Sequence, residues 1–495
     1  MRSLLLAGGA TLALATVADA ADLPSRNGAA PAREKPDGFA SFRSWLDAAP
    51  SERPLSFGGV TLYGQIDLGA GYSTHAARFN DSYPNGVAAL VGMQSQGGAW
   101  QAVPSGLGRS NIGLKWKEPI VADWYLIGDV NAGFDPYSLR FSNGPASLAQ
   151  NSTIPQINQT ANGDSSRAYG LINTDAFAGV SNKTFGALTY GRQYSFSNDN
   201  DGAYDPFGGA YAFSLIGAAT TLGGGLGVTE LSRYNNAIKY EYADHGLRIG
   251  AMSQLGGYAA GNSAQYAFET DIGFDYAGFS FDGVYQYGKD AVTLAVWGTA
   301  TAAPTPTTLK AIIADANALQ LVGKYKRDKF QAFGGYQYGR LTDPSDLPAG
   351  TTLRPFNGGY VAAYGIGQQG LGATGAFPHP KVTQVGWIGG KYAVAPNLDL
   401  TAGYFHVWQN DYSLAAAKVC GPNAKSAGGG YAPQGTVSLK CAGGEDAISG
   451  LIDWRPLKRV DLYVGAMYSK VRGGMAKGYF VDNNTAVTGG VRVSF

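Results

Sequence analysis

The chain ends on a segment whose apolar and polar positions alternate, residues 487–495 (VTGGVRVSF). Every second residue from Val487 to Phe495 is apolar or glycine, and Arg492 and Ser494 fall on the opposite side of an extended strand. This period of two is typical of a strand with one face in lipid and the other in water. Because soluble domains rarely end on an exposed phenylalanine, the segment predicts the closing strand of an outer-membrane β-barrel.

The same alternation recurs along the chain and predicts about sixteen strands of the length that crosses a bilayer at a tilt. We expect these strands at residues 60–72, 109–118, 124–134, 171–181, 185–194, 232–242, 247–255, 266–276, 279–287, 319–326, 330–340, 381–392, 397–409, 446–453, 460–471 and 485–495. The sequence therefore predicts an all-β fold, a transmembrane antiparallel β-barrel of about 16 strands, over residues 57–495.

The connections between the expected strands alternate in length. Turns such as 182–184 and 277–278 are very short. Long connections occur around 73–108, 135–170, 195–231, 288–318, 341–380 and 410–445. A barrel with short periplasmic turns and long external loops produces this alternation, whereas a soluble β-sandwich has no reason to keep every second turn short.

Residue parity assigns the two faces of each strand. Arg109 and Lys115 share one side of the second expected strand, and Arg233 and Lys239 share one side of the sixth. Aliphatic and aromatic residues occupy the opposite sides. If the basic sides line the lumen, no isolated charge meets hydrocarbon. We therefore expect these four basic side chains on the inner wall.

The N-terminal region has a different character. Residues 1–20 combine a basic start, an apolar stretch and a small-residue cleavage site, which predicts a secretory signal peptide. Residues 21–56 form a leader outside the barrel, with a short amphipathic helix from Asp37, its expected N-cap, to Leu46. The leader either covers the periplasmic rim or is loosely attached.

Composition narrows the classes of partner. Charged residues make up only 15% of the chain and nearly cancel to a net charge of +1, so nothing favours nucleic-acid binding. No cofactor motif is present. Cys420 and Cys441 share one expected external loop in an oxidising compartment, which favours a disulfide over a metal site. Two unpaired thiols are the alternative.

The histidines argue against catalysis. Of the four, His75, His245 and His379 fall in expected loops or turns, and His406 falls on an outward-facing side. A Ser–His triad needs a histidine beside its nucleophile. We therefore expect no enzyme activity.

Seven segments, in this order and spacing, resemble the general porins of Gram-negative outer membranes, particularly the alpha-proteobacterial ones. They are GVTLYGQIDLG (59–69), SNIGLKWKEP (110–119), DAFAGVS (175–181), FGALTYGRQY (185–194), YDPFGGAYAF (204–213), RYNNAIKYEY (233–242) and the closing strand. The resemblance covers about residues 57–495. It implies a homotrimer of sixteen-stranded barrels, embedded in outer-membrane lipid, in which each subunit carries its own pore.

The resemblance further implies that the third loop, about residues 195–231, folds into the lumen and sets acidic side chains against basic ones on the wall. The acidic candidates of the loop are Asp199, Asp201, Asp205 and Glu230. The basic candidates of the wall are Arg109, Lys115, Arg233 and Lys239. Where the family often has basic residues, this chain has Gln65, Asn111 and Thr174.

A pore of this kind implies passive diffusion of small hydrophilic solutes and ions, with selectivity set by its lining charges. A solute-specific channel for sugars or anions is the main alternative, and a structural or adhesive barrel is another. An acidic third loop predicts a preference for cations.

One expectation concerns assembly. If strands 171–181 and 185–194 are joined by the shortest turn, paired residue numbers sum to about 367, which sets Asp175 opposite Arg192 on the outward face. A charged pair in lipid is costly, so this face is expected at a subunit contact. A position in the headgroup region is the alternative.

Overall fold

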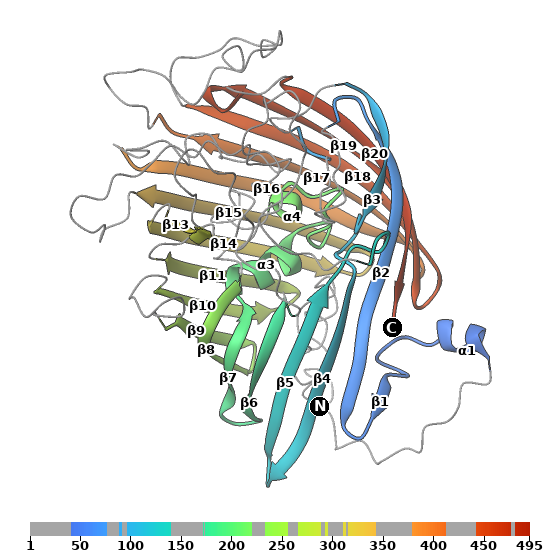
Figure 1. Cartoon of the computed structure of the whole chain (residues 1–495), viewed down its shortest axis with the longest axis vertical. Coiled ribbons are helices and arrows are strands. Elements are labelled where there is room, and N and C mark those ends of the chain that lie inside the picture. Colours follow the sequence, from blue (N-terminus) through green and yellow to red (C-terminus); the bar gives the residue numbers. More distant parts are fainter. Residues whose placement is uncertain are drawn as a thin grey trace.

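The computed structural model describes residues 41–76, 89–91, 97–139, 172, 174–219, 233–255, 266–288, 293–295, 310–312, 315–342, 379–411, 442–476 and 481–495. Within these ranges, sixteen long strands form one closed antiparallel barrel (Figure 1). They are β2 (Val60–Ser73), β4 (Asn111–Val121), β5 (Trp124–Gly133), β6 (Asp175–Asn182), β7 (Gly186–Tyr194), β8 (Arg233–Asp244), β9 (Leu247–Gln254), β10 (Ala267–Tyr276), β11 (Phe279–Gly288), β14 (Asp315–Arg327), β15 (Phe330–Thr342), β16 (Lys381–Ala395), β17 (Leu398–Gln409), β18 (Gly443–Leu457), β19 (Val460–Gly473) and β20 (Asn483–Ser494). The predicted number and order of strands are confirmed.

Shorter elements complete the described part of the chain. They are the helices α1 (Phe42–Leu46), α3 (Phe196–Tyr204), α4 (Leu215–Ala219) and η5 (Gly474–Ala476), and the strands β1 (Leu55–Phe57), β3 (Ala99–Pro104), β12 (Thr293–Ala295) and β13 (Lys310–Ile312). None of the helices in the described ranges is long and apolar enough to cross a membrane. Strands β1 and β3 join the main sheet, whereas β12 and β13 pair only with each other.

The barrel closes where the last strand meets the first. Strand β20 pairs with β2 from Gln65 opposite Ser494 to Ser73 opposite Ala486. Beyond this ladder, the backbone N–H of Phe495 donates to Gly64 O at 2.9 Å, and Gly64 N–H donates to Phe495 O at 3.0 Å. The two ends of the barrel sequence are therefore joined by an uninterrupted run of backbone hydrogen bonds.

Two separate strands, β3 and β4, lie next to β2 in the barrel wall. Strand β4 pairs with the first half of β2. Strand β3, which lies in the expected connection 73–108, pairs with the second half of β2, and residues 105–110 interrupt the wall between these two strands. The carboxylate of Asp67 holds this interruption in place, accepting hydrogen bonds from Leu107 N at 2.7 Å and Gly108 N at 3.0 Å. Arg109 consequently lies in the interruption, because β4 begins at Asn111 and not at residue 109.

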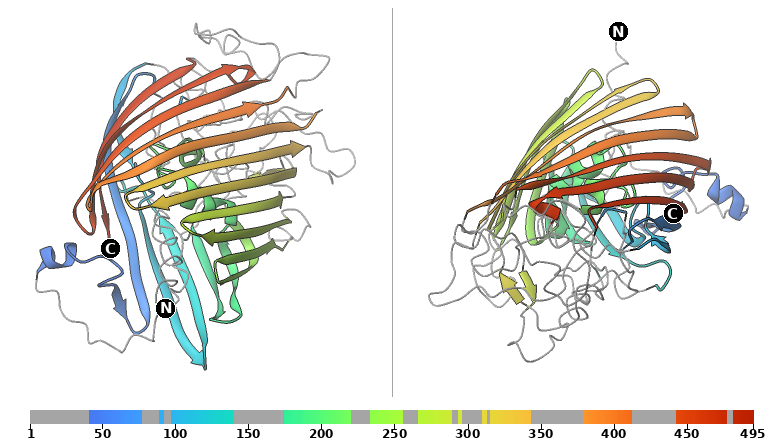
Figure 2. Two further views of the ribbon diagram at one scale, coloured as in Figure 1. Left: turned by 180° about the vertical axis from the view of Figure 1, so that it is seen from behind. Right: turned by 90° about the horizontal axis from the view of Figure 1, so that it is seen from above.

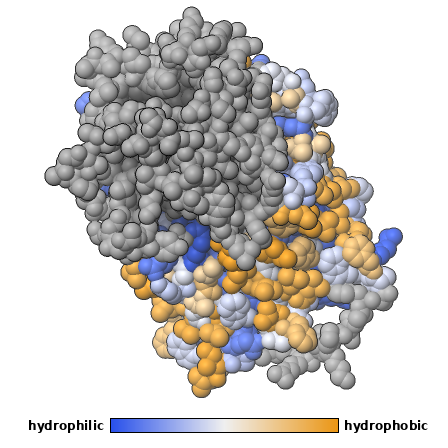
Figure 3. All heavy atoms as spheres, viewed as in Figure 1, coloured by the Kyte–Doolittle hydropathy of each residue, from blue (hydrophilic) through white to orange (hydrophobic). Residues whose placement is uncertain are grey.

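The outer surface of the barrel is apolar. Large hydrophobic side chains alternate outward along the strands and remain exposed, as they do on β4 and β5 at Ile112, Leu114 and Leu126. Figure 3 shows hydrophobic residues gathered over β2, β4 and β5 on the face in view. An outer surface of this extent and apolar character is typical of a barrel that faces lipid, because such a patch would be costly in water.

The interior holds elements of the chain itself. Helices α3 and α4 lie inside the barrel in all three ribbon views (Figures 1 and 2). Helix α1 lies outside it, beside the C-terminus. The helix starts at Phe42 with Ser41 as N-cap and not at Asp37, which lies outside the described residues; the Ser41 side chain accepts from Ser44 N.

Candidate functional site

The chain that follows β7 turns into the lumen and forms α3. Ser195 is the N-cap of this helix, and its side chain accepts a hydrogen bond from Asn198 N at 3.2 Å. The helix lies against the inner faces of β10, β11, β14 and β15. Residues 195–219 therefore form the described part of a lumenal loop, as the resemblance implied for the third loop.

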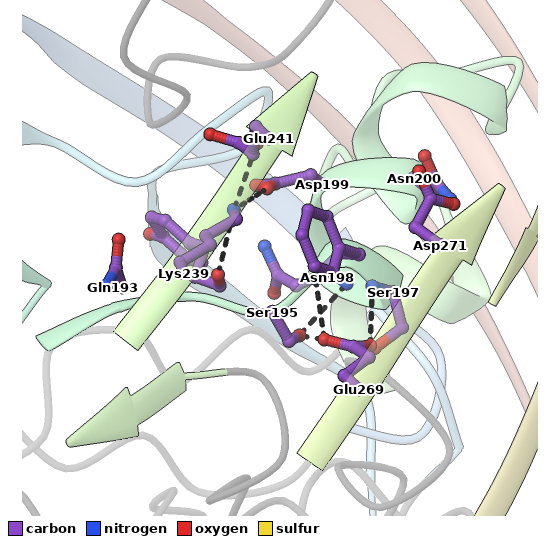
Figure 4. Close-up of polar contacts among 12 residues, drawn as sticks. Gln193, Ser195, Ser197, Asn198, Asp199, Asn200, Lys239, Glu241, Glu269 and Asp271 are labelled. Carbon is purple, nitrogen blue, oxygen red and sulfur yellow. Dashed lines mark hydrogen bonds and ion pairs between the residues drawn. The ribbon is translucent and has the colours of Figure 1, made fainter. Parts of the chain in front are cut away.

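The first turn of α3 is bound by a carboxylate from the wall. Glu269 of β10 accepts hydrogen bonds from Phe196 N at 2.8 Å and Ser197 N at 2.9 Å (Figure 4). The N-terminal N–H groups of a helix have no partner within the helix and carry partial positive charge, so a carboxylate is a favourable partner there. Gln286 of β11 donates to the same carboxylate at 3.3 Å.

An ion pair holds the next residues of the helix. Lys239 of β8 lies 3.0 Å from Asp199 and 3.5 Å from Glu241, and its ammonium donates to Tyr194 O at 3.2 Å (Figure 4). The structure therefore brings together two predicted site residues, Asp199 and Lys239. Burial raises the pKa of Asp199, and the nearby charge of Lys239 opposes that shift.

Two other predicted acids are turned away from solvent. Asp201 is only 6% exposed and accepts hydrogen bonds from Gln320 of β14, at 2.8 Å, and from Gln337 of β15. Asp205 is 2% exposed and accepts from Gly209 N at 2.7 Å. Burial raises the pKa of Asp205 to about 7. These carboxyl groups anchor the loop, so they do not form the exposed acidic row that the resemblance implied.

The end of α3 is fixed around Tyr204. Its hydroxyl donates to Asp282 of β11, and Arg248 of β9 donates to the same hydroxyl at 3.1 Å. Trp387 of β16 donates from its indole to Tyr204 O at 3.1 Å. Lys324 of β14 donates to Ala203 O at 3.2 Å. Four wall strands therefore converge on the last turn of this helix.

Beyond α3 the loop reaches the far side of the lumen. The ring centroid of Phe207 lies 6.2 Å from that of Phe405 on β17. Phe213 packs edge-on against Tyr463 of β19 at 6.0 Å, and Ala212 N donates to Gly106 O at 2.9 Å. The loop thus contacts the wall from β8 round to β19, and it narrows the lumen.

The predicted basic residues divide into two groups. Arg109 donates to Tyr194 OH at 2.9 Å and to Thr174 Oγ1 at 2.7 Å. Arg233 lies over the Tyr194 ring, 4.0 Å from its centroid, so Tyr194 joins the two arginines where the loop begins. Lys115 lies elsewhere on the inner wall, 5.0 Å from the ring centroid of Tyr63.

Sequence reasoning missed several residues that shape this site. Glu269, Arg248 and Asp282 contact the loop directly, and none was singled out. A further inward-facing pair, Arg455 with Asp399 at 3.0 Å, lies on the same inner wall. The sequence did contain a signal for these residues. Each of them occupies a position along its strand that alternation assigns to the lumenal face.

The expected pairing of Asp175 with Arg192 is wrong. Asn182 is paired with Gly186, so the turn holds three residues and the paired numbers sum to 368. The Asn182 side chain stabilises this longer turn by accepting from Thr184 N at 2.8 Å. Ala176, and not Asp175, therefore lies opposite Arg192, and Asp175 pairs with Asn131 and is buried. A shift of one residue moves a side chain to the other face.

Three predicted residues lie outside the described ranges, Glu230, Cys420 and Cys441, as do the expected signal peptide and the rest of the leader up to residue 40. Within the described ranges, no group of three or more His, Cys, Asp or Glu side chains could hold a metal ion. The disulfide and the signal peptide stay predictions.

The sequence and the fold are similar to those of known outer-membrane proteins. A family model described as Gram-negative porin matches residues 9–474. An outer membrane porin protein of Bordetella pertussis is 23% identical over 190 residues; the match covers 37% of this chain and 38% of that relative, so it spans well under half of either protein.

Solved structures agree in fold. An anion-selective porin from Comamonas acidovorans superposes with a TM-score of 0.52 at 15% identity, covering 88% of this chain and 99% of that one. The outer membrane protein OmpT of Vibrio cholerae superposes with a TM-score of 0.51 at 14% identity, covering 89% and 99%. The alpha-proteobacterial type stays a prediction. Because the family model spans almost the whole sequence, the chain belongs to the Gram-negative porin family.

Proposed function

We propose that this protein is a water-filled pore for the passive diffusion of small hydrophilic solutes and ions. Its family and its barrel fold place it in the bacterial outer membrane and point to a channel rather than an enzyme. The observation that carries the proposal is the lumenal loop, which polar contacts from Glu269, Lys239, Gln320 and Trp387 hold across the inside of the barrel.

The loop gives the pore a narrow and polar waist. A hydrated solute that passes it can exchange water for contacts with partly exposed charged groups, such as Asp199 of the loop and Arg248 of the wall. An apolar solute gains no such contacts in return for the water it loses. No step in this process needs energy coupling or a cofactor. Passage is then limited by size, with selectivity from those charges that remain accessible.

Single-channel recording in planar bilayers tests the proposal. Purified protein should give stepwise conductance that rises with salt concentration without saturating, and liposomes that contain it should swell in small neutral sugars of any stereochemistry. Conductance that saturates, or swelling with one sugar only, would support a solute-specific channel instead. A barrel that does not conduct would contradict the pore.

We also propose a homotrimer, which rests on the family resemblance. The Asp175–Arg192 pair no longer supports it, since the two residues are not opposite each other. Chemical cross-linking in native membranes, followed by mass measurement in detergent, should give a species of three chains. A monomer under both conditions would exclude this assembly.

A further inference from the structure

The segment that precedes the barrel, residues 41–57, is bound tightly at the periplasmic rim. Arg459, in the turn between β18 and β19, donates from its guanidinium to Trp45 O at 2.9 Å, Arg53 O at 2.6 Å and Ala49 O at 3.4 Å. The same guanidinium lies over the Trp45 ring at 4.5 Å. Three carbonyl groups and one aromatic ring thus converge on a single buried arginine, which makes the segment part of the folded barrel.

Further contacts attach the segment on both sides of the closing strand. Lys458, beside Arg459, forms an ion pair with Glu52 at 2.6 Å. At the other end, β1 pairs with β2, with Leu55 opposite Leu62 and Phe57 opposite Val60. Strand β20 lies between β19 and β2, so the segment bridges the seam where the barrel closes.

Two aromatic side chains of this segment are largely exposed. Phe57 is 87% exposed and Phe42 is 72% exposed, although the rest of the segment is docked. Phe42 stacks on Trp45 with ring centroids 5.4 Å apart. A single exposed aromatic side chain is common on protein surfaces, but one that continues a larger apolar surface marks an interaction site.

The pairing of β1 shows what surrounds Phe57. Paired residues of a sheet share a face. Phe57 is opposite Val60, which in turn is opposite Trp116 of β4, and Val60 belongs to the outward, lipid-facing side of β2. Phe57 therefore extends the apolar outer surface of the barrel past its periplasmic edge. Figures 1 and 2 place α1 outside the barrel wall at the same end.

We propose that residues 41–57 form an interfacial collar that lies on the inner leaflet of the outer membrane, with Phe42 and Phe57 inserted among phospholipid headgroups and upper acyl chains. Aromatic rings favour this zone, where one part of the side chain is apolar and its surroundings are partly wet. Arg43 is 83% exposed and forms only a loose ion pair with Asp47, at 3.8 Å, so its guanidinium can also meet lipid phosphates. Arg459 sets the orientation of α1, and the pairing with β2 sets that of Phe57.

Site-directed spin labelling tests the collar in the full chain, reconstituted into vesicles of phosphatidylethanolamine and phosphatidylglycerol. Native thiols are removed with Cys420→Ser and Cys441→Ser. Nitroxides are then attached through Phe42→Cys, Phe57→Cys and, as a control on the same segment, Ser51→Cys. The ratio of collision rates with oxygen and with a polar nickel chelate should be about tenfold higher at positions 42 and 57 than at 51, because apolar surroundings concentrate oxygen and exclude the chelate.

The role of Arg459 in holding residues 41–57 is tested in the same vesicles with Arg459→Ala. Position 42 should then give the values of water, while position 57, held by β1, keeps its ratio; Arg459→Lys should fall between. Bilayer conductance confirms that the barrel itself is folded. Values typical of water at both positions in the parent protein would overturn the proposal. Exclusion of both reagents would overturn it as well, because that pattern indicates cover by protein, either a second copy or a periplasmic partner.

Discussion

The inner wall of the barrel has two halves that hold the lumenal loop in different ways. From β8 to β15 the wall is polar and binds α3 through directed contacts, such as Glu269 with the helix N-terminus and Lys239 with Asp199. From β16 to β20 the part of the wall that meets the loop is largely apolar, although the same strands also carry the inward ion pairs Arg455–Asp399 and Arg492–Asp461. The buried side chains of that part pack with residues 89–91 and α4 into one hydrophobic cluster, which includes Phe405, Val407, Met467, Val471, Leu90, Val91, Phe213 and Leu215.

The difference separates two physical tasks. Hydrogen bonds and ion pairs depend on direction, so the polar half determines where α3 lies and which charges stay accessible. Hydrophobic burial has no direction but scales with area, so the apolar half supplies most of the free energy that keeps the loop inside. A barrel lumen is therefore not uniformly wet, and its two halves should respond to different substitutions.

The largest effect is expected in the apolar half. Phe405→Ala removes a fully buried ring that packs against Phe207, and should lower the free energy of unfolding by about 3–5 kcal/mol. Leu400→Ala is the matched control, because Leu400 lies on the same strand and faces outward. Urea unfolding in detergent, followed by the heat-dependent shift in gel mobility, measures both. Equal losses would contradict a core at Phe405.

A smaller effect is expected in the polar half. Lys239→Met removes the ion pair with Asp199 and should cost about 2 kcal/mol, less than a fully buried pair, because the Asp199 side chain is 28% exposed. The channel should also become noisier, since α3 loses one of its anchors. Lys239→Arg is the control that keeps the charge. A quiet channel with Met at this position would show that the remaining wall contacts of α3, such as those of Glu269 and Gln320, hold the helix without Lys239.

One charged residue within the apolar cluster sharpens the comparison. Glu445 is 0% exposed, and among the described residues neither of its carboxyl oxygens has a hydrogen-bond partner. It lies between Val407 and Val471, its paired residues. Glu445→Leu should stabilise the protein by about 1–2 kcal/mol, because it removes an unsatisfied buried group. Glu445→Gln should gain less, and a loss of stability with Leu would mean that the carboxyl group is solvated in the working protein.

The smallest effect is expected from an acid that the sequence placed in the constriction. Asp201 lies on the side of α3 that faces the wall and accepts a hydrogen bond from Gln320, so Asp201→Asn should leave the reversal potential in a salt gradient nearly unchanged. Asp199→Asn is the comparison, because its carboxyl group is more exposed. A clear shift toward anions with Asp201→Asn would place that carboxyl group in the permeation path.

The strands could be predicted because apolar and polar residues alternate along each of them, so that the local sequence shows which face of the wall a residue occupies. Registers were harder to predict, since they depend on the turn. At Asn182 a side-chain hydrogen bond to Thr184 favours three turn residues, and that one extra residue moved Asp175 to the inner face. A three-residue turn with such a hydrogen bond and the shortest, two-residue turn are close in free energy. The alternation of apolar and polar residues does not show which of the two turns forms.

The candidate site was predictable only in part for a different reason. That the 195–231 loop carries acids, and that Lys239 faces inward, follows from the sequence. Which acid meets which wall group depends on contacts between residues far apart in the chain, such as Gln320 and Gln337 with Asp201. Nothing near Asp201 in the sequence distinguishes it from Asp199, yet one anchors the loop and the other pairs with Lys239.

The joining of Phe495 to Gly64 has a consequence for how the protein is made. These residues are 431 positions apart, and their backbone groups bond directly. A ring-shaped sheet has no free edge only after its last pair forms, so every earlier intermediate exposes two edges that could pair with other chains. Since that pair needs Phe495 as well as Gly64, all of residues 64–495 must reach the membrane before closure. The interval in which the open edges can aggregate therefore lasts until this whole stretch has been delivered.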